Sequence, residues 1–321
     1  MKKIAMAFAC SALVSMTMTA QVAKIALQHN GNVTLYDADQ MPAVMTACVD
    51  GDTIYLNEGS FINDFTISKK ISIIGSGENS ILTGKVTVNI PGTPMLTAHL
   101  LDALNCQSYI TFSAPTNGVK IRKCQFVGLS FNATTEDATI DRCYSRGGNA
   151  NPLTLSSYMK NVNVVNSKVY CLNGNASSAN DVNFINCNIY NMYNTNNSNR
   201  CLATYMNCII RSWSYSNSSY HNAATIYVNC LCGEDRFTNS VNQNCWNNNS
   251  TTILDSSSNC SLGDDALQSN GYLGTDGTVV GITGGSNPYT LVPTVPKVTD
   301  YTIGVDTDTK KLIVNLKVTA N

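Results

Sequence analysis

Cysteine is the residue type whose spacing in this chain first suggests chemistry. The 321-residue sequence contains 13 cysteines, and one group of them recurs at the same position of a short pattern. The group is Cys124, Cys143, Cys187, Cys208 and Cys230. Metal-binding thiols usually lie close together in the sequence, and the close pair here, Cys230 with Cys232, has no histidine near it. We therefore expect no metal site and interpret the group as core residues, with disulfides as the alternative.

Carboxylates are sparse in the repeated region, which bears on enzymatic function. They are Glu136, Asp137, Asp141, Asp181, Glu234, Asp235 and Asp255. A glycoside hydrolase needs two carboxylates at a defined separation, and a Ca²⁺ site needs several oxygen ligands together. Residues 233–236, Gly-Glu-Asp-Arg, are the most enzyme-like short stretch, but a charged turn is the simpler interpretation. The histidines are scattered and no nucleophile or phosphate-binding motif is found, so we assign no catalytic residue and no cofactor.

Two arginines and two tyrosines share another position of the pattern, the third residue after the repeated Cys or Ser. They are Arg146, Tyr170, Tyr190 and Arg211, which we call the outer stripe. If each copy of the pattern is one coil of a stacked structure, the stripe points outward and is about 15 Å long. Aromatic rings beside arginine can stack on sugars and bind their hydroxyl groups. The stripe is therefore the candidate ligand site. The alternative interpretation is that these residues form a solvated face with side-chain ladders.

The pattern itself predicts the architecture. Its third residue recurs at intervals of 19, 24, 20, 21 and 22 residues, at Ile121, Ile140, Val164, Phe184, Tyr205 and Tyr227. A period of this size is typical of a solenoid. Within each copy, apolar and polar residues alternate as in a strand. The fifth residue is asparagine in four successive copies (Asn166, Asn186, Asn207 and Asn229), and asparagine suits a sharp left-handed corner. Each copy therefore predicts one coil of a parallel β-helix.

The two ends of the chain do not follow the pattern. Residues 22–36 are predicted to form a first strand and Asp37–Cys48 a short helix, with Asp39 as N-cap and Pro42 in the first turn. We expect this helix to cover the open end of the coils. After the last copy, Asn244-Cys245-Trp246 and Asn259-Cys260 echo the pattern at shorter spacing. The C-terminal tail reads as a hairpin, and because an isolated hairpin is marginal in water, it should pack on the solenoid or on a partner.

Three early stretches carry a resemblance to a known family. Residues 51–56 read GDTIYL, 59–61 read GSF and 67–77 read ISKKISIIGSG. Together with the Asn-Cys coils, they resemble exported bacterial right-handed parallel β-helix proteins of the pectin lyase-like superfamily, over residues of about 30–265. Residues 274–289 resemble the closing segment of such proteins. The resemblance implies an all-β, single-stranded right-handed β-helix; lyases of this superfamily generally hold Ca²⁺ with clustered Asp or Glu and use Lys or Arg as base.

These patterns define the expected organisation. Residues 1–20 read as a signal peptide, with Lys2 and Lys3 as its basic region and cleavage near Ala20. The β-helix with its cap should occupy residues 21–290, a Pro-rich linker 291–297 and the hairpin tail 298–321. We expect a protein that is secreted, periplasmic or on the cell surface. The net charge of −1 argues against nucleic acid as a partner.

The functional expectation follows from the paired arginines and tyrosines and from the sparse carboxylates. It is a non-catalytic exported protein that binds a polysaccharide or cell-surface glycan, or that acts as a structural surface element. The alternative is a polysaccharide lyase or glycoside hydrolase, because one fold can host many functions.

Overall fold

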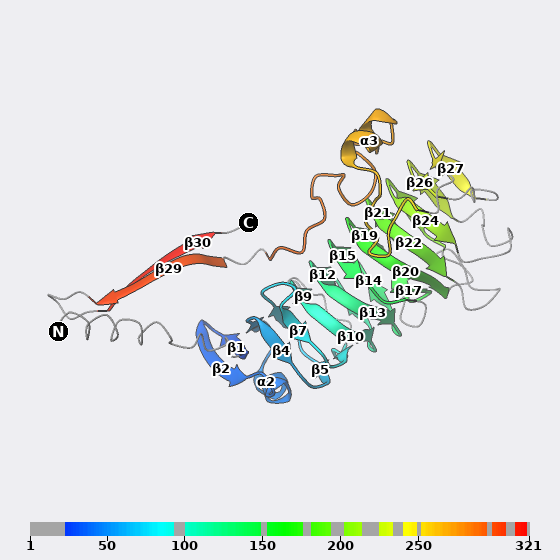
Figure 1. Cartoon of the computed structure of the whole chain (residues 1–321). Coiled ribbons are helices and arrows are strands. Elements are labelled where there is room, and N and C mark those ends of the chain that lie inside the picture. Colours follow the sequence, from blue (N-terminus) through cyan, green and yellow to red (C-terminus); the bar gives the residue numbers. More distant parts are fainter. Residues whose placement is uncertain are drawn as a thin grey trace, which may run out of the picture.

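The computed structural model describes residues 23–92, 100–148, 153–175, 181–193, 202–213, 225–233, 240–248, 252–293, 297–305 and 312–319. The predicted signal peptide 1–20, most of the 233–236 turn, and two of the three histidines lie outside these residues. In the described part the chain is an all-β parallel solenoid whose coils stack along one axis (Figure 1). The repeat therefore predicts the fold class correctly.

The first half of each coil contributes a strand to one long sheet. Its described strands follow the order β2-β1-β3-β6-β9-β12-β15-β19-β21-β23-β25-β27, and from β3 onward neighbouring strands run parallel. The parallel strands are β3 (Thr53–Leu56), β6 (Ser72–Ile74), β9 (Leu101–Asp102), β12 (Lys120–Arg122), β15 (Thr139–Asp141), β19 (Val162–Val165), β21 (Val182–Ile185), β23 (Thr204–Met206), β25 (Ile226–Val228) and β27 (Val241–Gln243).

The second half of each coil forms the opposite sheet, which we call sheet B. Its strands are β4 (Gly59–Phe61), β7 (Ser80–Leu82), β10 (Asn105–Phe112), β13 (Gln125–Phe131), β16 (Tyr144–Ser145), β20 (Lys168–Asn175), β22 (Asn188–Tyr193), β24 (Ile209–Trp213), β26 (Leu231–Cys232) and β28 (Trp246–Asn247), with β5 (Phe65–Ile67), β8 (Val86–Val88) and β17 (Leu153–Ser156) beside them. A short third sheet contains β11 (Thr116–Asn117), β14 (Thr135–Glu136) and β18 (Met159–Lys160).

Asparagine forms the corner between the two long sheets. Asn166, Asn186, Asn207 and Asn229 have φ of 44°, 53°, 55° and 49°, which is the left-handed region expected for these residues. Their side chains also connect successive coils: Asn207 Nδ2 donates to Asn186 Oδ1 at 3.3 Å, and Asn229 Nδ2 donates to Asn207 Oδ1 at 3.2 Å. In the earlier coils the same corner contains Ala103, Lys123 and Arg142, at φ of 52–54°.

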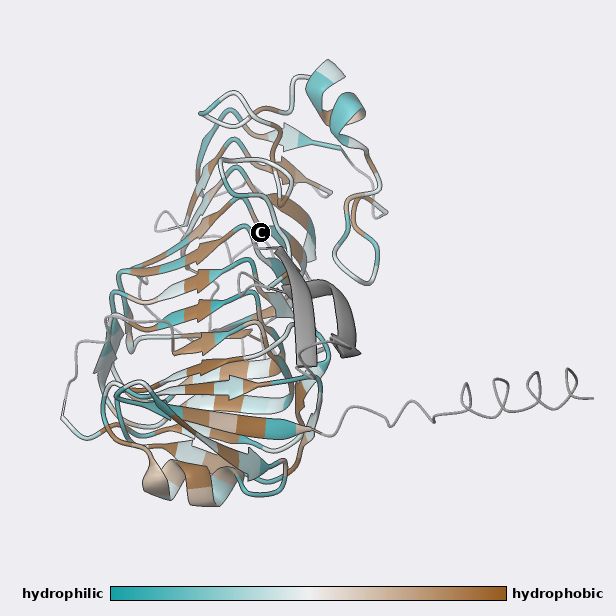
Figure 2. Cartoon of the chain, turned by 90° about the vertical axis from the view of Figure 1, so that its left-hand side faces the viewer, coloured by the Kyte–Doolittle hydropathy of each residue, from teal (hydrophilic) through white to brown (hydrophobic). Residues whose placement is uncertain are grey.

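The interior is built from columns of identical coil positions. The predicted inward column, Ile121 to Tyr227, is buried and in register from coil to coil. Its last three members stack face to face, with ring centroids 5.1 Å apart for Phe184–Tyr205 and for Tyr205–Tyr227. Figure 2 shows the alternation as brown and teal bands along the coils.

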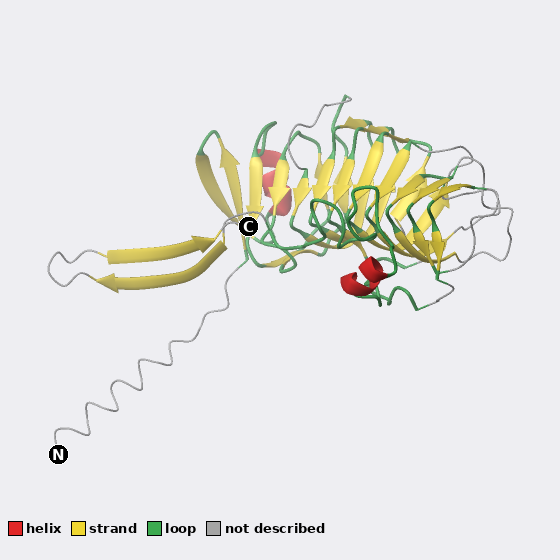
Figure 3. Ribbon diagram, turned by 90° about the horizontal axis from the view of Figure 1, so that it is seen from above, coloured by secondary structure: helices red, strands yellow, loops and turns green. Residues whose placement is uncertain are grey.

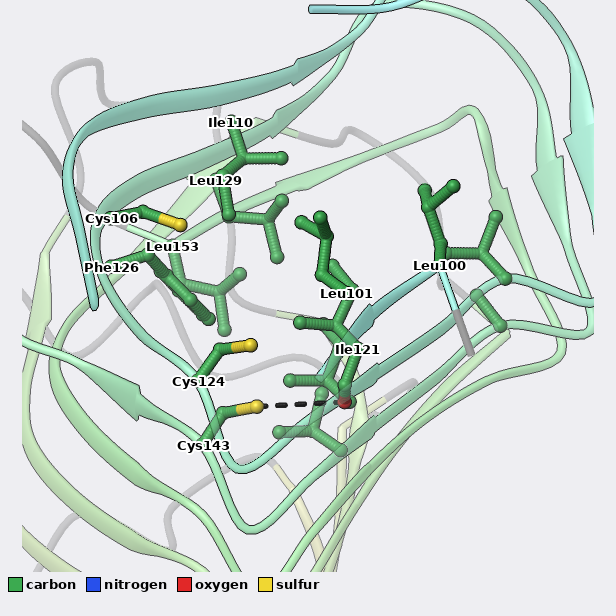
Figure 4. Packing of buried hydrophobic residues seen from close by; sticks show 14 of the residues in the cluster. Leu100, Leu101, Cys106, Ile110, Ile121, Cys124, Phe126, Leu129, Cys143 and Leu153 are labelled. Atoms are coloured by element: carbon green, nitrogen blue, oxygen red, sulfur yellow. Dashed lines mark hydrogen bonds between the residues drawn. The ribbon is translucent and has the colours of Figure 1, made fainter. Parts of the chain in front are cut away.

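The repeated cysteines form a second buried column. Each of the five is a free thiol and almost inaccessible to solvent, as the packing interpretation predicts. Figure 4 shows Cys124 and Cys143 of this column pointing into the core, where the Cys143 thiol donates to the Ile121 carbonyl at 3.5 Å. Backbone carbonyl groups near the left-handed corner accept hydrogen bonds from the buried thiols. Ser167 takes the place of cysteine in one coil and donates to the Val165 carbonyl at 2.8 Å.

This bonding predicts which replacements the cysteine column tolerates. Cys208 donates to the carbonyls of Phe184 and Met206 at 3.4 and 3.3 Å. A Cys208→Ser variant keeps a donor there, as Ser167 does, and should lose less than about 1 kcal/mol of unfolding free energy. Cys208→Val removes the donor and should lose about 1–3 kcal/mol. Chemical denaturation of both variants checks the order; equal losses would contradict a hydrogen-bonding role.

Thiol labelling provides a second check on this column. Burial raises the pKa values of the Cys143 and Cys208 thiols above the usual value for cysteine. Because the thiolate is the reactive form, the five thiols of the column should label slowly in the native protein, after the partly exposed Cys245 and Cys260, and completely only after denaturation. Rapid labelling of any of the five repeated cysteines in the native protein, located by peptide mass spectrometry, would contradict burial of the column.

The N-terminal end differs from the sequence prediction in two details. Residues 24–37 form a hairpin of β1 (Lys24–His29) and β2 (Asn32–Asp37) rather than one strand, because Asn30 and Gly31 adopt φ of 47° and 81° in a tight turn. The helix, α2 (Met41–Ala47), has Gln40 rather than Asp39 as its N-cap, although a proline does occupy its first turn. Met41 and Val44 are buried against the first coils, so the helix covers the open end as predicted.

Residues 252–293, which we call the return segment, leave the last described coil and run back over the corner and sheet B (Figure 3). Asn259-Cys260 lies in this segment, where Cys260 pairs antiparallel with Leu254, and is not a further coil. The segment includes the short helix α3 (Asp264–Ser269). A second apolar cluster joins it to sheet B, and its buried members are Ile209, Leu231, Ile253, Leu254, Leu267, Val279 and Val280. The tail then forms the antiparallel pair β29 (Lys297–Val305) and β30 (Leu312–Thr319).

Candidate functional site

The outer stripe lies on the outward face of sheet B. Val169 pairs with Ile189 in β20 and β22, which brings Tyr170 beside Tyr190. The two rings are stacked, with centroids 4.8 Å apart and planes 11° from parallel. Both side chains are half-buried. The phase predicted from the sequence, with these residues outward and in register, therefore agrees with the geometry.

Arg211 extends the stack on the next coil. Its guanidinium carbon lies 4.2 Å from the centroid of the Tyr190 ring, which is a cation–π contact. Because β22 lies between β20 and β24, Tyr190 has Tyr170 on one face and Arg211 on the other. Three residues of the outer stripe thus form a side-chain ladder. Ring edges and hydroxyl groups, rather than the two faces of Tyr190, are what the ladder presents to a ligand.

Arg146, the fourth residue of the stripe, extends away from the ladder. Its Nη2 donates to Asn105 Oδ1 at 2.9 Å, and Asn105 Nδ2 donates to the Glu78 carbonyl at 2.9 Å. The side chain therefore reaches toward the N-terminal coils. The spacing in the sequence predicts its outward direction but not this rotamer.

A cleft of about 700 Å³ adjoins the stripe, between sheet B and the return segment. Gln125, Tyr144 and Lys168 from β13, β16 and β20 form its floor. The return segment supplies one wall, and Glu58 and residues 76–79 close the N-terminal end. The wall residues are Tyr289, Leu291, Val292 and Pro293. Lys168 and Tyr170 are alternate residues of one strand, so the cleft and the ladder share a face of the sheet.

Lys168 is the central charged group of the cleft. Its Nζ donates to Asn259 Oδ1 and lies 4.7 Å from the centroid of the Tyr289 ring and 5.8 Å from that of Tyr144. Burial lowers the pKa of Lys168 from its usual value, and burial also raises the pKa values of Tyr144 and Tyr289. The cleft thus combines a partly desolvated amine with two phenols and nearby carboxylates.

Polar contacts from the corner and from sheet B hold the return segment against the coils. The buried side chain of Asn188 forms two hydrogen bonds with the return segment. Its Nδ2 donates to the Ser258 carbonyl at 2.9 Å, and its Oδ1 accepts from the Ile282 amide at 3.3 Å. Lys123 Nζ donates to the Val292 carbonyl at 2.7 Å. Asn188 and Ile209 belong to a column that the repeat places outward, and they are buried because the return segment covers them.

The remaining candidates from the sequence have ordinary contacts. Glu136 forms an ion pair with Lys160 at 3.0 Å, and Asp137 accepts from Asn161 at 2.6 Å. In the described part of the chain, no three His, Cys, Asp or Glu side chains are grouped so that they could hold a metal ion. Nor does any helix among those residues have the length and apolar character to cross a membrane.

Comparisons of the chain with models of protein families, with curated proteins and with solved structures found no match. The candidate site therefore rests on the geometry of this chain alone.

Proposed function

We propose that this protein is an exported, non-catalytic β-solenoid that binds a polysaccharide or cell-surface glycan. The observation that carries the proposal is the position of the cleft beside the tyrosine ladder on one rigid sheet face. Phenol hydroxyls, the Gln125 amide, the Lys168 amine and the Glu78 carboxylate can all bond sugar hydroxyls. The cleft and the outer stripe lie on the same face of sheet B, and a ligand that contacts both must be an extended chain and not a small molecule.

Two further features support this class of ligand. The resemblance of residues 51–77 to exported β-helix proteins of the pectin lyase-like superfamily favours export and a polysaccharide ligand. The carboxylates of Glu58 and Glu78 at the cleft disfavour nucleic acid, whose backbone carries a phosphate at every nucleotide. Glycan binding is thus the function that the site supports best.

The test uses affinity electrophoresis against neutral and uronic-acid polysaccharides. The double variant Tyr170→Ala/Tyr190→Ala should fold, because both rings lie on the outer face, and should bind about 30-fold more weakly, or about 1 kcal/mol per ring. Tyr158→Ala is the matched control, since Tyr158 is a 48 % exposed tyrosine outside the cleft and stripe. Retardation of the parent that the double variant does not change would remove the stripe from the site. Failure of every polysaccharide to retard the parent would contradict the proposal.

A polysaccharide lyase is the second candidate, and the environment of Lys168 favours it. Burial lowers the pKa of Lys168, which makes its amine easier to deprotonate than that of an exposed lysine. A neutral Lys168 could take the proton from C5 of a uronic acid while the C4–O bond breaks, which leaves a C4=C5 double bond; the departing oxygen keeps the bond pair and takes a proton from water. Ultraviolet absorbance of that unsaturated product is the measurement. If the protein is a lyase, Lys168→Met should abolish formation of the product. If the parent forms no product, the lyase function is excluded and the binding function stands.

A further inference from the structure

An apolar patch is exposed on the outer face of the solenoid at its N-terminal end. Leu35, Val33 and Tyr55 expose 68 %, 59 % and 38 % of their surfaces. Leu35 pairs with Ala26, Ala26 with Tyr55 and Tyr55 with Ile74, so apolar residues line up across four neighbouring strands. We call Val33, Leu35, Ala26, Tyr55 and Ile74 the N-terminal patch. Contiguous exposed apolar surface of this kind usually marks an interaction site.

The patch lies at the edge of a sheet, where exposed apolar residues are usually covered by another element. β2 is the last strand of its sheet, and all but one of its residues are exposed. An apolar edge strand without a cover is a template for aggregation. Helix α2 covers the open core of the first coils through Met41 and Val44, and it therefore packs on the inner side and not on the outer face.

The tail has a matching apolar face. In the β29–β30 register, Tyr301 is opposite Leu316, Ile303 opposite Val314, and Val305 opposite Leu312. Since residues alternate between the two faces of a strand, these six residues share one face, while the intervening Thr302–Asn315 pair belongs to the other. A two-stranded hairpin with one apolar face is at best marginally stable alone in water.

The path of the chain brings the tail to the patch. A Cβ atom on Gly77 would lie 3.0 Å from Pro293 Cγ, so the return segment ends beside the second coil. Ile74 of the patch is only three residues before Gly77. From Pro293 to Lys297 the chain can span at most about 14 Å, and the four strands of the patch extend over about 15 Å. In Figures 1 and 3 the hairpin leaves the solenoid at this N-terminal end and extends away from it.

We propose that the apolar face of the β29–β30 hairpin docks on the N-terminal patch of the same chain. The hairpin then packs as a second layer on β2, β1 and β3, at the spacing of about 10 Å that is usual between sheets. The short tether raises the local concentration of the hairpin at the patch, which favours docking within the chain over docking on a second copy.

Methyl NMR of the full chain tests the docking directly. With leucine and valine methyl groups labelled in a deuterated background, we expect nuclear Overhauser contacts between Leu35 or Val33 and Val314 or Leu316. Leu35→Lys and, in a separate variant, Val314→Lys should abolish these contacts and sharpen the hairpin resonances, because an undocked hairpin tumbles faster. The matched controls Thr34→Lys and Asn315→Lys alter the opposite faces of the same strands and should leave the contacts in place.

Three results would overturn the proposal. One is the absence of contacts in the parent chain together with sharp hairpin resonances. Another is contacts that appear only between differently labelled chains in a mixed sample, which would assign the patch to a second copy. The third is broad hairpin resonances without contacts to the patch, which would place the hairpin elsewhere. None of these measurements depends on polysaccharide binding.

Discussion

Replacing Tyr205 with alanine is expected to lower the free energy of unfolding by about 3–5 kcal/mol, the range for removing a large aromatic side chain from a core. Tyr205 is 0 % exposed and stacks on two rings at once, Phe184 on one side and Tyr227 on the other. Its loss opens a cavity and breaks both stacks. Because each coil buries its apolar face only against its neighbours, this damage lies at the interface that holds consecutive coils together.

A conservative variant separates the ring from the hydroxyl group. Tyr205→Phe keeps both stacked contacts and should retain most of the stability, with a loss of about 1 kcal/mol from the hydroxyl. Urea denaturation followed by circular dichroism measures both variants. If the alanine variant were as stable as the phenylalanine variant, the stacked column would not be a main source of cohesion between coils.

The repeat predicts those parts of the fold that every coil must repeat. Strand alternation identifies the buried column that contains Phe184 and Tyr205, and the recurrent asparagine identifies the left-handed corner. Lys123 and Arg142 adopt the same corner conformation. The sequence does not mark these two positions, because parallel pairing with neighbouring coils imposes a conformation that their own preference does not favour.

Two features at the N-terminal end differ from the prediction although the sequence carries a local signal for them. Asn30-Gly31 is a strong hairpin signal, but the apolar, extended character of both halves of residues 22–36 predicts one strand. The N-cap of α2 is Gln40, one residue after the predicted Asp39, because the boundary of a helix depends on a single turn of backbone.

The cleft depends on contacts that no short-range pattern encodes. Lys168 and Tyr289 are 121 positions apart in the numbering, and the return segment that joins them has no repeat. For the outer stripe, spacing alone places Tyr170, Tyr190 and Arg211 in one column. It does not predict that the rings stack on one another, because that depends on rotamers that the coil spacing selects.

The second large effect is expected at Asn188, the buried amide under the return segment. Asn188→Leu leaves the Ser258 carbonyl and the Ile282 amide without their partner, at a cost of about 2–4 kcal/mol for two unsatisfied buried groups. The segment should then detach locally, since the Asn188 amide bonds it at both Ser258 and Ile282. Limited proteolysis of the native protein should show faster cleavage within residues 252–293.

A matched asparagine tests whether this effect belongs to the return segment. Asn183 is half-buried on the other sheet and donates to Asn163 Oδ1 at 3.1 Å, so Asn183→Leu removes one contact within a ladder and should leave the proteolysis pattern unchanged. Detachment would also remove Tyr289 and Leu291 from the wall of the cleft. Polysaccharide binding should therefore weaken in Asn188→Leu and not in Asn183→Leu. If Asn188→Leu exposed the segment to protease and still bound polysaccharide as the parent does, the ligand would contact sheet B alone, and the return segment would be a structural brace.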